Sequence, residues 1–99
     1  MAELRWTQEA ELWLKDIYDY IALDNPQAAE EVVDGIYSTA QLLKDHPEMG
    51  HNYQSPGFDN VRILLHGHYR IAYIILENRI DILGVFHGAL DIDKYMWGV

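Results

Sequence analysis

Hydrophobic side chains recur at steps of three and four residues in the first half of the chain, which predicts two amphipathic helices. The first should cover roughly residues 8–23 with Thr7 as its N-cap, because a threonine hydroxyl can accept a free backbone N–H. The second should cover about residues 26–45, with Asn25 as N-cap and Pro26 at the first helical position. A short turn separates them, so they should pack as an antiparallel hairpin.

Strand patterns dominate the rest of the chain. A short strand is predicted at residues 4–6, and longer apolar runs follow at residues 61–65, 69–76 and 79–87. Glu77 and Asn78 fit the turn of a hairpin between the last two runs. The run at residues 69–76 is apolar on both faces, so it should be a central strand that is covered on part of both sides. This order predicts an α+β domain whose helical hairpin packs on one face of a mainly antiparallel, four-stranded sheet.

Residues 46–60 show no periodicity and contain Pro47, Gly50, Pro56 and Gly57. A connection of about 15 residues is long for a compact domain and is often functional. Since no repeat, linker or low-complexity stretch appears, we expect one domain over residues 1–99, with residues 91–99 as a C-terminal tail.

The charge is unevenly distributed. The chain has a net charge of −9, and the acids outnumber the bases only within residues 1–60. Nucleic-acid affinity comes largely from Lys and Arg, so direct nucleic-acid binding is not expected of that region. Cysteine is absent, which excludes disulfides and thiolate chemistry. The first residues lack the apolar run of a secretory signal, and no apolar segment is long enough to span a bilayer, so we expect a cytoplasmic protein without a membrane partner.

The order of the predicted elements, together with several residues at matching spacings, resembles the ParE/RelE superfamily of toxins. The sequence is more similar to the ParE-like branch of that superfamily than to the RelE-like branch. The residues that carry the resemblance are Trp6-Thr7, Ala10, Leu14, Ile17, Tyr20-Ile21, Asn25-Pro26, Ala28-Ala29, Leu43, Pro47, Gly50, Arg62, Tyr69-Arg70-Ile71, Tyr73, Ile80, Ile82-Leu83, Val85 and His87-Gly88-Ala89. Each fragment is weak alone, whereas their order and spacing together are specific and run over nearly the whole chain.

The resemblance implies a toxin of a type II toxin–antitoxin system that a cognate antitoxin neutralises in a hetero-oligomeric complex. ParE-like members are associated with inhibition of DNA gyrase, whereas RelE-like members cleave messenger RNA on the ribosome. A third reading is an attenuated toxin fold that persists as a binding module. No cofactor is implied.

Metal-free RNA cleavage needs a base, an acid and cations around one phosphate. If the protein is a nuclease, the candidate catalytic residues are Arg62, Arg70, His87 and Tyr95. RelE-like members carry lysines near the middle of the chain, where this sequence has His51, Tyr53 and Gln54. Leu90 stands where the family often has an arginine. The cation cluster of the nuclease branch is therefore missing, which favours a toxin that acts by binding.

The candidate target-binding residues are Arg62, Tyr95, Met96 and Trp97. Arg62 should contact a partner or an anion, or else form an ion pair with an acid from the helices. His87 is more readily a structural hydrogen-bonding residue than a proton-transfer group. The tail presents large apolar side chains of the kind that are enriched at the buried centres of interfaces, and in the ParE-like branch this segment is implicated in toxicity.

A metal site is not expected. His66 and His68 have a spacing that occurs in zinc sites, but Gly67 suggests a turn between them and no further ligand is fixed by spacing. The acid pairs Glu30-Glu31 and Asp16/Asp19 fall on the polar sides of the helices, where solvated charges are expected.

Overall fold

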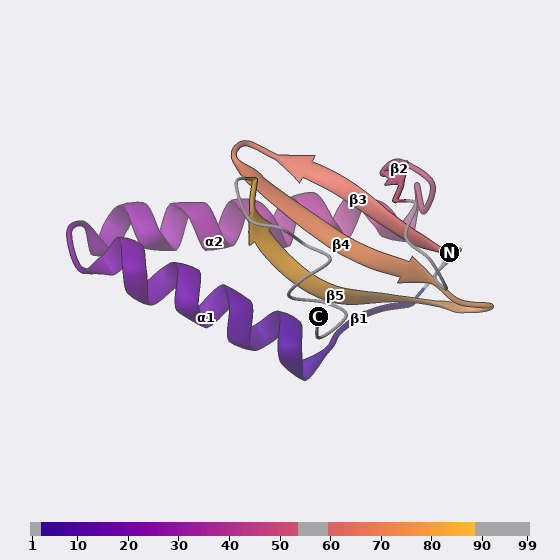
Figure 1. Cartoon of the computed structure of the whole chain (residues 1–99), viewed down its shortest axis with the longest axis horizontal. Helices are drawn as coiled ribbons and strands as arrows, with labels where there is room; N and C mark the ends of the chain where they lie inside the picture. Colours follow the sequence, from indigo (N-terminus) through magenta and orange to yellow (C-terminus); the bar gives the residue numbers. More distant parts are fainter. Residues whose placement is uncertain (1–2, 54–59, 89–99) are drawn as a thin grey trace.

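The structure is a computed structural model, and it describes residues 3–53 and 60–88 (Figure 1). Two α-helices, α1 (Gln8–Ala22) and α2 (Pro26–Gln41), form a hairpin and are followed by a short 3-10 helix, η1 (Leu42–Lys44). The strands are β1 (Glu3–Trp6), β2 (His51–Asn52), β3 (Val61–His66), β4 (Tyr69–Ile75) and β5 (Arg79–His87). The predicted elements are all present, most with bounds shifted by one or two residues.

The strands form one sheet in the order β1-β5-β4-β3-β2, and the helical hairpin lies along one face of it (Figure 1). β1 runs parallel to β5, and the other neighbours are antiparallel. The predicted α+β class with a mainly antiparallel sheet is confirmed. The predicted number of four strands is wrong, because β2 adds a fifth. Its two residues, opposite Ile63 and Arg62, are too few to produce a periodic pattern.

Both helix starts follow the predicted capping chemistry. The Thr7 hydroxyl accepts the Ala10 N–H at 3.2 Å, and the Asn25 side chain accepts the Ala28 N–H at 3.1 Å. Pro26 occupies the first turn of α2. α2 ends at Gln41 rather than near residue 45, since the chain tightens into η1 before Pro47.

The main core lies between the helices and the sheet. Its buried residues are Ala10, Leu14, Ile36, Ala40, Leu43, Leu64, Ile71, Tyr73, Ile80, Ile82 and Val85. Ile63, Ala72 and Phe86 form a second buried cluster on the other face of the sheet. β4 lies between β3 and β5 and contributes to both clusters, as predicted for a central strand.

Within residues 3–53 and 60–88, neither helix is both long and apolar enough to cross a membrane.

Candidate functional site

Arg62 holds the turn that follows η1. Alternation along β3 places its side chain on the helix-covered face, with Leu64 and His66. The guanidinium donates to the carbonyls of Gly50 at 2.5 Å and Glu48 at 3.2 Å, and its Nη2 lies 3.9 Å from the Glu48 carboxylate. The expected ion pair exists, but its acid comes from the turn rather than from the helices. A contact between Arg62 and a partner stays a prediction.

Tyr73 supports the same turn from the core. Its hydroxyl donates to the Pro47 carbonyl at 2.6 Å and accepts the Gly50 N–H at 3.0 Å. Burial raises the pKa of Tyr73, and the Gly50 N–H and the charge of Arg62 only partly oppose this. A Cβ at position 50 would lie 2.7 Å from the Ile63 carbonyl oxygen, so glycine is required there. The spacing of Pro47, Gly50 and Arg62 thus reflects one anchored turn.

Arg70 and His87 lie at the opposite end of the sheet. The Arg70 guanidinium donates to the Gly88 carbonyl. The exposed ring of His87 stacks on His68 with centroids 6.2 Å apart, and Tyr69 meets it edge-on at 5.8 Å. Burial raises the pKa of Tyr69. The rings of His87, His68 and Tyr69 are therefore in contact, whereas Arg70, the next residue along β4, points to the other face of the sheet.

The predicted nuclease residues that the structure describes are not gathered at one point. In the β3–β4 register Arg62 is opposite Tyr73 and Arg70 is opposite Leu65. The two arginines are therefore about 10 Å apart along the strands, at 3.3 Å per residue, and they point to opposite faces. Tyr95, Met96 and Trp97 lie outside the described residues.

His66 is engaged by α2 rather than by His68. Its Nδ1 is 2.7 Å from the Thr39 hydroxyl, and its ring lies against Gly35. Gly67 has φ +57°, which forms the turn that the sequence suggested. The described part of the chain contains no group of three or more side chains that could hold a metal ion. Asp16, Asp19, Glu30 and Glu31 are all exposed.

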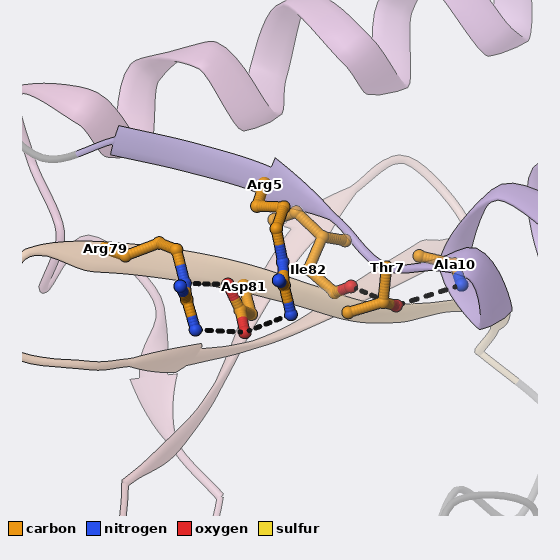
Figure 2. A network of polar contacts seen from close by, with 6 residues as sticks. All are labelled: Arg5, Thr7, Ala10, Arg79, Asp81 and Ile82. Carbon is orange, nitrogen blue, oxygen red and sulfur yellow. Dashed lines mark hydrogen bonds and ion pairs between the residues drawn. The ribbon is translucent and has the colours of Figure 1, made fainter.

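A buried carboxylate on the face away from the helices was not predicted. Asp81 is only 6% exposed and lies between two arginines (Figure 2). Arg79 Nε is 2.8 Å from one carboxylate oxygen, and Arg5 Nη2 is 3.2 Å from the other. Arg79 and Asp81 are two positions apart on one strand and so share a face, a signal visible in the sequence. Arg5 joins them only through the β1–β5 register.

A smaller polar contact joins the two helices. The Tyr37 hydroxyl lies 2.9 and 3.1 Å from the two carboxylate oxygens of Glu11. Burial, followed by this hydrogen bond to a negative group, raises the pKa of Tyr37 to about 12. The Tyr37 ring packs on Trp6 with centroids 4.6 Å apart, and the buried Trp6 indole N–H finds no acceptor among residues 3–53 and 60–88.

Two solved structures have this fold. A chain of the chromosomal ParDE toxin–antitoxin system from P. aeruginosa is 27% identical with a TM-score of 0.75, over 88% of this chain and 96% of that one. A chain of the toxin–antitoxin complex RelBE2 from Mycobacterium tuberculosis is 21% identical with a TM-score of 0.62, over 87% of this chain and 96% of that one. The second likeness shows the fold alone. The fold is thus that of the ParE/RelE superfamily of type II toxin–antitoxin toxins, and of the two structures ParDE is the more similar.

The family model for the ParE toxin of type II toxin–antitoxin systems matches residues 4–92, and the chain belongs to that family. The comparison with curated proteins gave no match. The membership confirms the resemblance inferred from the sequence.

Proposed function

We propose that this ParE-family toxin acts by binding and inhibiting a target, for which the family implies DNA gyrase, and not by cleaving RNA. The observation that carries the proposal is the use of Arg62. Two of its hydrogen bonds hold the turn at Glu48 and Gly50, and its side chain is only 19% exposed. Arg70 lies on the other face of the sheet. Phosphoryl chemistry requires cations that converge on one phosphate, and these two do not.

The charge supports the same function. A net charge of −9 disfavours stable binding to ribosomal RNA, which requires clusters of Lys and Arg. We propose further that a cognate antitoxin neutralises the toxin in a hetero-oligomeric complex in the cytoplasm. Both similar structures come from toxin–antitoxin systems, which supports an antitoxin as partner.

The deciding experiments measure toxicity in cells and then compare two activities of the purified protein, gyrase inhibition and RNA cleavage. We expect growth arrest or filamentation when the toxin is expressed alone, relief when the adjacent small gene is co-expressed, and inhibition of DNA gyrase in a supercoiling assay. Primer extension on ribosome-bound messenger RNA should show no cuts. Cuts that vanish in His87→Ala or Arg70→Ala would instead establish the nuclease. Normal growth with folded toxin would favour the attenuated binding module.

The C-terminal segment is our proposed target contact, together with Arg62. Deletion of residues 92–99, which include Tyr95, Met96 and Trp97, should abolish toxicity and leave antitoxin binding intact. Thermal melts of the full and shortened chains provide the control. A melting temperature that stays within a few degrees supports target contact. If Trp97 covers the core instead, its loss should cost about 3–5 kcal/mol and the melt should collapse.

A further inference from the structure

The helical hairpin carries most of the negative charge of the protein. Between residues 8 and 41, eight acids stand against one base, Lys15, which accounts for −7 of the net −9. All eight side chains are exposed: Glu9, Glu11, Asp16, Asp19, Asp24, Glu30, Glu31 and Asp34. The outer surface of the hairpin is therefore strongly acidic.

Most of these acids have no partner inside the described part of the chain. Lys15 pairs with Asp19 at 2.8 Å, and Tyr37 meets Glu11. The other six make no hydrogen bond or ion pair with the residues that the structure describes. Charges of one sign on one surface repel each other and destabilise the compact state. A partner of opposite charge would remove that repulsion when it binds.

Large apolar side chains stand among the acids on the outer side of α1. Leu12, Asp16, Asp19 and Leu23 follow one another at steps of four, three and four residues, so they form one stripe on the helix surface. The stripe is opposite to Ala10 and Leu14, which are buried in the core. Leu12 is 55% exposed and Leu23 is 83% exposed.

Tyr20, beside this stripe, is 79% exposed. Large apolar side chains that gather on one surface are typical of a protein interface. We define the acidic–apolar face as Leu12, Asp16, Asp19, Tyr20 and Leu23.

We propose that the antitoxin docks on the acidic–apolar face, and that its contacting segment is basic, with Lys or Arg placed between apolar side chains. This rests on the proposed function, because it takes the antitoxin as the partner. An acidic segment would place like charges together, which complementary interfaces avoid. A second copy of the hairpin would bring the same negative charge, and nucleic acid would be repelled for the same reason.

The test measures the affinity of the purified toxin for the product of the adjacent antitoxin gene by calorimetry. Between about 50 and 500 mM salt the Kd should rise roughly tenfold or more, since salt screens exposed charges. The charge-reversed double variant Asp16→Lys, Asp19→Lys should weaken binding roughly tenfold at low salt. The control reverses two exposed acids elsewhere, Asp45→Lys and Glu77→Lys, and should leave the Kd nearly unchanged.

A second pair of variants tests the apolar part of the face. Leu12→Ser and Leu23→Ser should each weaken binding at high salt, where the electrostatic contribution is screened. Circular dichroism checks that every variant is folded. If a variant does not fold, the salt series on the unaltered toxin still tests the docking proposal.

Antitoxin that binds with the same Kd at both salt concentrations, or that binds the charge-reversed variant equally well or more tightly, overturns the proposal and leaves the proposed function standing. A folded toxin that binds no antitoxin in either buffer contradicts the proposed function itself, and the docking surface with it.

Discussion

In the part of the chain that the structure describes, Tyr73 and Asp81 carry buried polar groups on opposite faces of the sheet, and the two groups are stabilised in different ways. Tyr73, on the helix-covered face, is fully buried, and its hydroxyl bonds with the backbone of Pro47 and Gly50. Asp81, on the other face, bonds with the side chains of Arg5 and Arg79. These two arginine side chains are 55% and 39% exposed. The partners of Tyr73 are therefore backbone groups, whereas the partners of Asp81 are charged and partly solvated side chains.

This difference in partners determines how the Tyr73 hydroxyl and the Asp81 carboxylate each contribute to the stability of the fold. A neutral hydroxyl between two backbone groups fixes the local course of the chain, and salt has little effect on it. A buried carboxylate must instead be compensated by charge, because an unpaired ion is costly away from water. The Tyr73 contacts therefore set the shape of the turn at residues 47–50, while Asp81 adds a charged side-chain contact to the backbone pairing of β1 with β5.

The largest effect should follow the removal of both arginines around Asp81. Arg5→Ala with Arg79→Ala leaves a buried carboxylate without a cation, and we expect a loss of about 3–5 kcal/mol in the free energy of unfolding. Urea denaturation measures this loss. Adding Asp81→Leu to the double variant should restore much of the stability, since an apolar side chain needs no partner. A loss of under about 1 kcal/mol would show that solvent already compensates Asp81.

Removal of the Tyr73 hydroxyl should have a smaller effect. Tyr73→Phe leaves the Gly50 N–H and the Pro47 carbonyl without their partner, and we expect a loss of about 2–3 kcal/mol in the free energy of unfolding. The matched control is Tyr20→Phe, whose hydroxyl is on an exposed side chain and should change stability by less than about 0.5 kcal/mol. Equal effects from the two variants would contradict the anchoring role of Tyr73.

A methyl group at position 50 tests the same turn by steric means. Gly50→Ala places a Cβ 2.7 Å from the Ile63 carbonyl oxygen, and we expect a loss of about 1–3 kcal/mol. Gly67→Asn is the control, because no atom lies within 4 Å of a Cβ at position 67 and asparagine tolerates its positive φ. Chemical denaturation of the two variants side by side measures the difference. A Gly50→Ala protein as stable as the control would mean that the turn can move.

The smallest effect concerns alkaline pH. The pKa of Tyr37 is raised from 10.0 to about 12, so the folded state holds this proton more tightly than the unfolded chain does. The associated stability is fully present below pH 10 and is lost as the pH rises toward 12. Thermal melts at pH 9 and pH 11 should show a smaller decrease for Tyr37→Phe than for the unaltered chain. The same decrease in both proteins would argue against the role of Tyr37.

Local chemistry made much of the fold predictable from the sequence. Thr7, Asn25 and Pro26 mark the helix starts through side-chain caps and a fixed backbone angle, which do not depend on distant residues. Gly67 likewise marks its turn through its own backbone angle. β2 was missed, because two residues carry no period.

The polar contacts of the candidate site were harder to predict. Arg62 was identified as a candidate, but its bonds to Glu48 and Gly50 depend on how an aperiodic turn lies against β3. The Asp81 network needs the register of β1 on β5, and no local pattern fixes that register.

The parallel attachment of β1 to β5 has a consequence for biosynthesis. Arg5 and Asp81 are 76 residues apart, so β1 must wait until β5 has been made before the two strands can pair. At roughly 5–20 residues per second, that wait lasts roughly 4–15 s for each newly made chain. Until then Leu4 and Trp6 have no strand to bring them to the core that they cover in the finished protein. A chain that stops before β5 leaves β1 without its neighbour in the sheet, so this part of the fold can form only after β5 has been made.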